Sequence, residues 1–189
     1  VYKRQVGKWI IQNAFSMCTE CRKYYPEFRV SINLSYVQIL KSPLMMELKQ
    51  MIDHSGISCS GIIVELTESG YLEGTPAVRS VWNDMKQLRI QIALDDFGTG
   101  YSNLMNISNL EPDIVKLDRG FTLKALSRSY EYQLMQYVIE MVHKLNQYVC
   151  VEGVETKEDL EKIKALGPDL IQGYYYSKPV SYTHLRAHE

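Results

Sequence analysis

Two adjacent acids, Asp95 and Asp96, end an apolar run and are the most informative candidates for chemistry in this sequence. The run covers residues 90–94 (Ile-Gln-Ile-Ala-Leu), and a loop containing Gly98 and Gly100 follows at once. Burying two like charges together is costly unless a metal ion or a proton compensates them. The pair therefore indicates a core strand whose end is built to hold a cation.

Polar or charged residues also follow the other apolar stretches of the chain. They are Asn33, Glu65, Lys116 with Asp118, Glu152 and Gln172. A single acid after a strand is more often a helix N-cap or a solvated loop residue, and glycines alone are ordinary in turns. The recurrence at successive strand ends is not predicted by that simpler interpretation.

The donor set is rich in oxygen and contains neither sulfur nor imidazole, which favours Mg²⁺ or Mn²⁺ over zinc or copper. Several carboxylates shared between two ions would match a two-metal arrangement, which generates hydroxide and stabilises the oxygens of an in-line displacement at phosphorus. A nearby lysine would orient the water or stabilise the anionic transition state. The implied chemistry is metal-assisted hydrolysis of a phosphate ester.

Helical and strand patterns alternate along the chain. The pattern predicts helices over 7–24, 43–55, 76–89, 122–146 and 156–167, and strands over 28–34, 62–67, 90–95, 114–118, 148–152 and 170–176. This alternation is typical of right-handed βαβ units and a parallel sheet. An open sheet would gather only the strand ends near its switch point, whereas a barrel gathers all of them. The sequence therefore predicts an α/β fold of the (β/α)₈ TIM-barrel type, with about six of its eight strands present.

Composition limits the other interpretations. The net charge of −1 argues against a nucleic-acid duplex as partner, because phosphate-backbone binding needs a basic face. No apolar run approaches the roughly 20 residues of a membrane span, so we expect no membrane contact by this segment. We expect a cytoplasmic protein, or the cytoplasmic part of a larger, membrane-anchored one.

The cysteines and histidines fit structural roles better than chemical ones. Cys18 and Cys21 form a C-x-x-C without the second close pair of a zinc site, so we expect reduced structural thiols, with metal or redox use as the alternative. His54 and His143 lie in helical stretches where we expect no acidic partner. His184 and His188 have a metal-binding spacing but lie in a tail that fits no element of a barrel.

Six segments of the sequence resemble, in order and spacing, the motifs of the EAL-domain family of bacterial cyclic di-GMP phosphodiesterases. They are residues 31–35 (Ser-Ile-Asn-Leu-Ser), 64–69 (Val-Glu-Leu-Thr-Glu-Ser), 94–102 (Leu-Asp-Asp-Phe-Gly-Thr-Gly-Tyr-Ser), 115–119 (Val-Lys-Leu-Asp-Arg), 151–156 (Val-Glu-Gly-Val-Glu-Thr) and 172–174 (Gln-Gly-Tyr). The resemblance implies hydrolysis of cyclic di-GMP to linear pGpG with two Mg²⁺ or Mn²⁺ ions.

The resemblance also assigns roles to individual residues. It implies that Asn33, Glu65 and Asp95 bind one metal, and that Asp96 and Asp118 serve the second. Glu152 becomes the general base or a further metal ligand, and Lys116 orients the attacking water. Glu68 would hold the loop after Asp96, which is linked in this family to homodimer formation, while Gln172 and Glu155 would line or support the site.

The sequence departs from the family pattern in one respect that bears on activity. The Glu-Ala-Leu segment, whose glutamate is a metal ligand, and the arginine that follows it are absent from these residues. We interpret residues 6–180 as a partial EAL domain, with residues 1–5 and 181–189 as non-native tails. We therefore expect the parent protein to be the active enzyme and this fragment alone to turn over little substrate. A degenerate domain that acts as a cyclic di-GMP receptor, or as a protein-interaction module, is the alternative.

Overall fold

The computed structural model describes residues 2–35, 44–67, 76–99, 107 and 110–179. The chain divides into two compact units, Val1–Leu94 with Met105–Asp113, and Asp95–Leu104 with Ile114–Glu189. The strand β3 (Gln91–Phe97) contributes residues to both units. Each unit is an alternation of helices and parallel strands, and each is described in turn.

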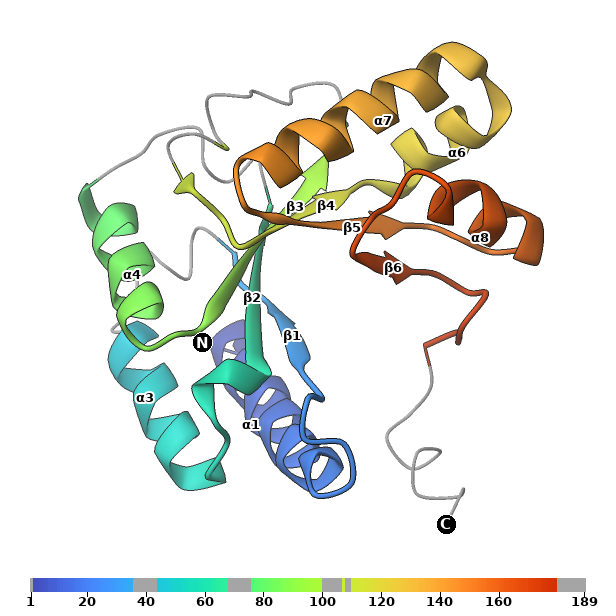
Figure 1. The fold of residues 1–189 in the computed structure, drawn as a ribbon. Coiled ribbons are helices and arrows are strands. Elements are labelled where there is room, and N and C mark those ends of the chain that lie inside the picture. Colours follow the sequence, from blue (N-terminus) through green and yellow to red (C-terminus); the bar gives the residue numbers. More distant parts are fainter. Residues whose placement is uncertain (1, 36–43, 68–75, 100–106, 108–109, 180–189) are drawn as a thin grey trace. The chain divides into compact units, whose positions relative to one another are not determined.

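The first unit begins with a long helix and contains two further helices. Its elements are α1 (Tyr2–Arg22), β1 (Val30–Asn33), α3 (Leu44–Ser55), the short 3₁₀ helix η1 (Cys59–Gly61), β2 (Ile62–Thr67), α4 (Pro76–Gln87) and the first part of β3. The strands β1 and β2 are parallel, with Asn33 opposite Glu65. Helix α1 packs against α3 and β1, as Figure 1 shows. Proline opens α4 because its fixed φ and missing N–H suit the first helical position.

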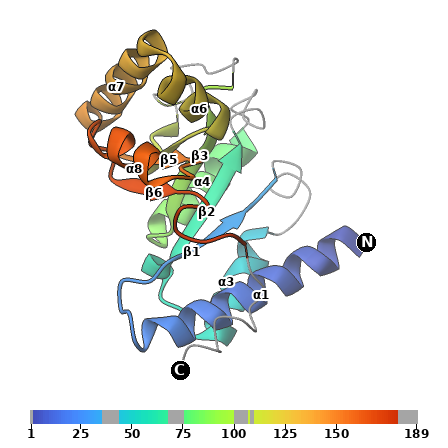
Figure 2. The ribbon, with the colours of Figure 1, turned by 90° about the vertical axis from the view of Figure 1, so that its right-hand side faces the viewer.

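The second unit continues the same alternation. After the end of β3 come β4 (Ile114–Leu117), α6 (Arg119–Ser127), α7 (Ser129–Lys144), β5 (Tyr148–Glu152), α8 (Lys157–Lys164) and β6 (Leu170–Gln172). The strands β4, β5 and β6 pair in parallel, with Glu152 opposite Gln172. Helices α6 and α7 pack on each other and on β5, and α8 packs on α6 (Figure 2).

The core of the second unit explains why β4 and β5 pair so regularly. All residues of β4 are buried, and so are Val149 and Val151 of β5. On the helix side, Met135, Ile139 and Val142 of α7 share one helical face and are at most 1% exposed. Their spacing of three and four residues is that of an apolar stripe facing a core.

The strand order among the described residues is β1-β2-β3-β4-β5-β6, and β1 with β2, β4 with β5, and β5 with β6 pair in parallel. Sequential neighbours joined by helices are the arrangement expected of βαβ units. The α/β fold predicted from the sequence is therefore confirmed.

An aspartate directly before each of two strands fixes where pairing starts. Asp113 donates its N–H to the Ile92 carbonyl at 2.9 Å, and its Oδ2 accepts the Ile92 N–H at 2.8 Å. Asp169 makes the same pair of bonds with Val149, at 3.1 and 2.7 Å. Each side chain thus satisfies a backbone N–H at the start of the ladder, which an unpaired strand end would leave open.

The helix that opens at Thr156 behaves as the sequence predicts. The Thr156 side chain accepts the Asp159 N–H at 3.1 Å, and the Asp159 carboxylate accepts the Thr156 N–H at 3.0 Å. This reciprocal capping box precedes α8, and Gly167 follows the helix with a φ of 75°. A left-handed glycine is the usual way for a helix to end.

Several predicted element boundaries are wrong, and the strand predicted over 90–95 extends to Phe97. The single helix predicted over 122–146 is two helices, because Arg128 adopts extended backbone with φ −138° and ψ 130°. The strand predicted over 170–176 ends at Gln172, since Tyr176 donates its N–H to the Gly173 carbonyl in a turn. Helix α1 begins at Tyr2, earlier than predicted.

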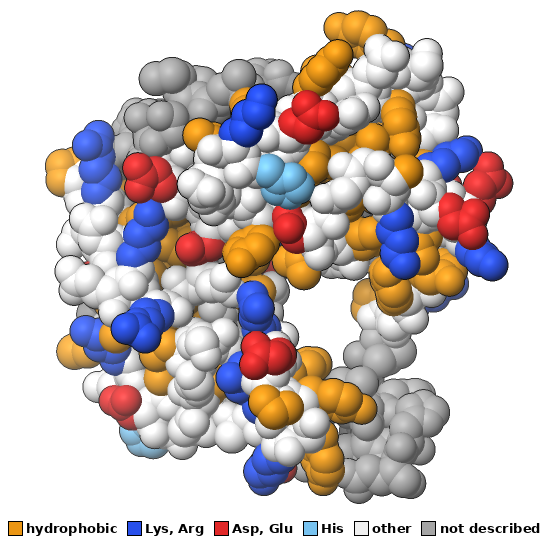
Figure 3. Space-filling view, viewed as in Figure 1, with side chains coloured by type: hydrophobic (Ala, Val, Ile, Leu, Met, Phe, Trp, Pro, Cys, Tyr) orange, Lys and Arg blue, Asp and Glu red, His pale blue; other side chains and the backbone are white. Residues whose placement is uncertain are grey.

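The surface carries charges of both signs. In Figure 3 the Lys and Arg side chains are interspersed with Asp and Glu, in keeping with the net charge of −1. None of the helices searched, which are those of the described residues, is long and apolar enough to cross a membrane. The predicted tail residues His184 and His188 lie outside the described part of the chain.

The C-x-x-C pair is not a disulfide, and its two thiols differ in their surroundings. Cys18 is fully buried, with its Sγ 3.7 Å from the Gly61 carbonyl oxygen and 3.8 Å from that of Phe28, whereas Cys21 is partly exposed. Burial raises the pKa of the Cys18 thiol above its ordinary value, because it disfavours the charged thiolate. Cys18 is thus a packing residue, as predicted.

This difference predicts selective alkylation. At pH 8, iodoacetamide should modify the partly exposed Cys21 and Cys59 well before Cys18, as followed by peptide mass spectrometry. Because the folded-state pKa of Cys18 is raised, the neutral thiol stabilises the fold below the unfolded pKa, and that contribution is lost as the pH rises above it. In urea all thiols should react alike, and equal rates in the folded protein would contradict the assignment.

Candidate active site

The ends of β3, β4 and β5 bring three of the predicted site residues into direct contact. The Lys116 Nζ lies 2.9 Å from Asp95 Oδ1 and 2.7 Å from Glu152 Oε1. Lys116 is 5% exposed, and the side chains of Asp95 and Glu152 are 14% and 20% exposed. The parallel strands therefore place one buried ammonium group between two largely buried carboxylates.

The electrostatic balance of this trio remains negative, because two carboxylates face one ammonium group. A buried charge is tolerated when opposite charges and hydrogen bonds replace its water shell. Lys116 can sit in the middle of β4 because its long stem passes between apolar neighbours while its Nζ reaches the acids at the strand ends. The arrangement can hold a proton acceptor, Glu152, beside a fixed positive charge.

One oxygen of Asp95 has capacity for a further positive partner. Asp95 Oδ1 is buried and makes no hydrogen bond of good geometry, although the Lys116 Nζ lies at ion-pair distance. A buried acceptor in this state is unusual, since most buried polar atoms are hydrogen-bonded. An oxygen-only donor set fits a hard divalent cation. Among the described residues, however, no group of three His, Cys, Asp or Glu side chains is already gathered as a metal site.

The backbone at Asp96 is strained. Asp96 has a φ of 61°, in the left-handed region that non-glycine residues seldom adopt. The next residues are tightly held: Phe97 is buried and accepts the Asp118 N–H at 3.0 Å, and Gly98 has a φ of 103°. A Cβ on Gly98 would lie 2.9 Å from the Phe121 ring, so the chain passes too close for a side chain there. Strain of this kind persists where surrounding contacts over-determine it, often at functional sites.

Asp118 has a structural task beside its predicted one. It is the N-cap of α6, and its Oδ1 accepts the Gly120 N–H at 2.7 Å. This is the simpler role that sequence reasoning assigns to a lone acid after a strand. One carboxylate oxygen is thus used for the cap, and the predicted metal-binding role stays a prediction.

The residues after β5 and β6 surround the turn that follows Glu152. Glu155 Oε1 accepts from Arg119 Nη2 at 2.7 Å and from Nε at 3.2 Å. This bond and the charge of Glu155 raise the pKa of the Arg119 guanidinium. Gln172 is exposed and lies opposite Glu152 in the parallel ladder. Its backbone carbonyl accepts the Val154 N–H at 3.3 Å.

Two predicted metal ligands belong to the first unit. Asn33 and Glu65 are neighbours across β1 and β2, and the Glu65 carbonyl accepts the Leu34 N–H at 3.0 Å. Glu65 is 7% exposed and Asn33 is exposed. The parallel register thus places Asn33, the last residue of β1, opposite Glu65 of β2. Glu68 and the loop beyond Thr99 lie outside the described residues.

Sequence reasoning missed two acid partners. His143 has an acidic partner, contrary to expectation: its Nε2 lies 2.9 Å from Asp169 Oδ2. The partnership of Arg119 with Glu155 was also not predicted. Both pairs join residues more than 25 positions apart, so local spacing carries no direct signal for them.

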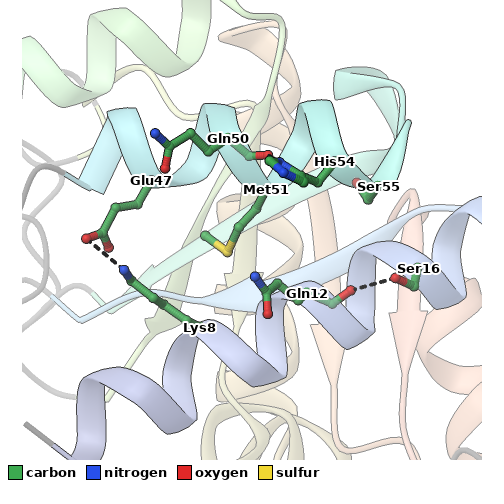
Figure 4. Close-up of a pocket in the computed structure, with 8 residues that line it drawn as sticks. All are labelled: Lys8, Gln12, Ser16, Glu47, Gln50, Met51, His54 and Ser55. Carbon is green, nitrogen blue, oxygen red and sulfur yellow. Dashed lines mark hydrogen bonds and ion pairs between the residues drawn. The ribbon is translucent and has the colours of Figure 1, made fainter.

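A separate groove of about 300 Å³ lies between α1 and α3 of the first unit (Figure 4). Its lining includes an ion pair of 2.9 Å between Lys8 Nζ and Glu47 Oε1, and His54, whose Nδ1 lies 2.6 Å from the Gln50 carbonyl oxygen. The groove lies between helices and not at the strand ends. Its charged pair is self-contained, so we assign the groove no chemistry.

Comparison with known proteins defines the class to which this fold and strand-end chemistry belong. The model of the EAL domain family matches residues 2–179, and the chain belongs to that family. Cyclic di-GMP phosphodiesterase PdeF of Escherichia coli (strain K12) is 30% identical over 174 residues, which cover 92% of this chain and 23% of PdeF. The chain thus spans about a quarter of the length of this curated relative.

Solved structures agree with the fold. The PaMucR phosphodiesterase in complex with c-di-GMP superimposes with a TM-score of 0.88 at 25% identity, over 97% of this chain and 75% of that one. A manganese and cyclic di-GMP complex of Klebsiella pneumoniae BlrP1 has a TM-score of 0.83 at 23% identity, over 93% and 44% of the two chains. The second likeness is one of fold. Both are consistent with the TIM-type α/β class predicted from the sequence.

The buried trio predicts a large stability effect. Replacing Lys116 by Met should lower the free energy of unfolding by about 3 kcal/mol, because two largely buried carboxylates lose their counter-charge. Urea unfolding of the two proteins measures this difference.

A matched control is Lys162→Met, which removes the exposed i,i+4 pair with Glu158. Exposed pairs contribute about 0–1 kcal/mol, so this change should be small. Equal losses for the two variants would contradict the buried ion-pair assignment.

The left-handed backbone at Asp96 predicts different stabilities for two small substitutions that both remove the carboxylate. Asp96→Gly should be the more stable of the two, since glycine adopts a φ of 61° without steric cost. Asp96→Ala should be about 1–2 kcal/mol less stable than Asp96→Gly, because alanine keeps the left-handed penalty. Thermal unfolding of both variants tests this, and identical melting temperatures would show that the backbone there is not strained.

Proposed function

We propose that the protein carrying this sequence hydrolyses cyclic di-GMP to linear pGpG with the help of a divalent cation. The observation that supports this most directly is the buried contact of Lys116 with Asp95 and Glu152 at the strand ends. Membership of the EAL domain family and the named activity of PdeF support the substrate class. A general base beside a fixed cation is what phosphodiester hydrolysis needs.

The reaction adds one water and opens one phosphodiester bond. The water oxygen forms a bond to phosphorus, and the bond from phosphorus to the 3′ oxygen breaks, which leaves the 5′-phosphate of pGpG. Glu152 accepts the proton of the attacking water, and that proton is returned to the leaving 3′ oxygen. Lys116 holds the Glu152 carboxylate at 2.7 Å and stabilises negative charge that develops on the phosphate.

The metal part of the proposal uses the oxygen donors of the strand ends. Asn33, Glu65 and Asp95 would hold one Mg²⁺ or Mn²⁺ ion, and Asp96 and Asp118 would serve a second. When bound, such ions supply Lewis-acid activation of water and neutralise phosphate charge. The oxygen-only donor set at the strand ends supports this assignment.

Other features of the proposal concern neighbouring residues and partners. Gln172 and Glu155 would line or support the site, and Glu68 would hold the loop after Asp96. Homodimer formation through that loop and a cytoplasmic location are further predictions.

The direct test is conversion of cyclic di-GMP to pGpG by the purified full-length parent protein, measured by chromatography in the presence of Mg²⁺, Mn²⁺ or EDTA. Turnover should require a divalent cation. Glu152→Gln should lower kcat by roughly 10²–10⁴-fold because the proton acceptor is lost. Calorimetry should still detect binding of cyclic di-GMP to that variant.

Glu158→Gln is the matched control, since Glu158 is exposed on α8 and pairs with Lys162. Its activity should equal that of the unchanged protein. Binding without pGpG formation under either metal would replace the phosphodiesterase by a cyclic di-GMP receptor. Absence of both binding and turnover would favour a protein-interaction module.

A further inference from the structure

Arg119 lies immediately beyond the strand that carries Lys116 and reaches the turn that follows Glu152. It is the first residue of α6, and two of its nitrogens donate to Glu155 Oε1, at 2.7 and 3.2 Å. The side chain of Arg119 is 57% exposed and that of Glu155 is 38% exposed. An exposed ion pair of this kind contributes little to the free energy of unfolding, so stability alone does not account for it.

The stem of Arg119 also covers the turn. A Cβ on Gly153 would overlap the Arg119 Cγ and lie 2.9 Å from its Cβ. Gly153 has a φ of 80°, a conformation that suits glycine, and it directly follows Glu152. The turn therefore approaches Arg119 so closely that no side chain fits between them.

The opposite side of the same turn is held from β6. The Val154 N–H donates to the Gln172 carbonyl at 3.3 Å, and the Val154 carbonyl accepts the Tyr175 N–H at 3.1 Å. A Cβ on Gly173 would overlap the Val154 carbonyl group. Residues 153–155 are thus fixed between Arg119 on one side and the chain after β6 on the other.

We propose that Arg119 is a positioning residue that sets the orientation of the Glu152 carboxylate by clamping the turn Gly153–Glu155. The segment Lys116–Arg119 contacts the chain around Glu152 twice, through the buried Lys116 pair and through the exposed Arg119 pair. With both contacts made, the backbone from which the Glu152 side chain projects is held in place, and Lys116 Nζ holds its carboxylate at 2.7 Å. This proposal rests on the proposed hydrolysis, because the oriented group is the proton acceptor of that reaction.

The test compares kcat and KM for cyclic di-GMP hydrolysis in Arg119→Met, Glu155→Gln and the double variant. Each single variant should lower kcat roughly 10- to 100-fold with KM unchanged, because the proton acceptor is misplaced while substrate contacts stay. The kcat of the double variant should be no lower than that of the less active single variant, since both substitutions remove the same contact. Arg119→Lys keeps the stem and the charge and should recover part of kcat.

Arg128→Met is the matched control, because Arg128 is 68% exposed and forms a comparable surface pair with Glu131 at 3.1 Å. Its kcat should equal that of the unchanged protein. A rise in KM with unchanged kcat in Arg119→Met would assign Arg119 to substrate binding and overturn the proposal. Equal kcat values in Arg119→Met and Arg128→Met would overturn it too.

Amide hydrogen exchange provides a measurement that needs no turnover. The Val154 N–H should exchange faster in Arg119→Met than in the unchanged protein, and at the same rate in Arg128→Met. If the unchanged protein does not hydrolyse cyclic di-GMP, the proposed function fails, and this comparison still decides whether Arg119 holds the turn. Unchanged exchange at Val154 in Arg119→Met would show that it does not.

Discussion

The buried ammonium group of Lys116 is the constraint on which the arrangement of the second unit depends. Its Nζ reaches Asp95 at 2.9 Å and Glu152 at 2.7 Å from the middle of a fully buried strand. A charge in this position is stable when its partners are held in place, because relaxation by water is limited. The parallel pairing of β4 with β5, and the hydrogen bond from Asp118 to the end of β3, supply that rigidity.

Hydrogen bonds also fix the starts of two strands. Asp113 and Asp169 each follow a proline and each exchange two hydrogen bonds with the neighbouring strand. Because a one-residue slip would move every side chain to the other face of the sheet, these bonds at the start protect the chemistry at the far end. The repeated Pro-Asp before β4 and β6 therefore helps to fix the register of these strands at their starts.

The sequence predicts the element types well because the strands are short, apolar and bounded by clear turn residues. The capping box at Thr156 is visible for the same reason, since its two partners lie three residues apart. The break at Arg128 is not visible, because neither proline nor glycine marks it and extended backbone there reflects the packing of α6 against α7. The left-handed backbone of Asp96 is also not visible in the sequence. Aspartate is common in loops whether its φ is negative or positive, so its presence does not indicate this conformation.

The candidate site shows a similar division between local and distant signals. Strand-end positions of Asp95, Lys116 and Glu152 follow from periodicity, whereas the N-cap role of Asp118 and the partner of His143 depend on which segments meet in space. The positive φ of Asp96 also changes the direction of its side chain relative to that of a regular strand. In a regular strand Asp95 and Asp96 would point to opposite faces. A left-handed residue interrupts that alternation just where two consecutive carboxylates are predicted to serve one site.

The two cation–carboxylate contacts around Glu152 share a spacing that the sequence does contain. Lys116 and Arg119 are three residues apart, and so are Glu152 and Glu155. Lys116 and Glu152 belong to the parallel strands β4 and β5, and Arg119 and Glu155 follow these strands. The equal spacing brings both contacts together once β4 pairs with β5, so it becomes informative only when that pairing is known. The residue types also suit their places. A lysine point charge can contact two buried acids, while the arginine fork donates twice to one oxygen and lays its stem over Gly153. Exchanging the two cations would therefore keep the charge of the site but lose both geometries.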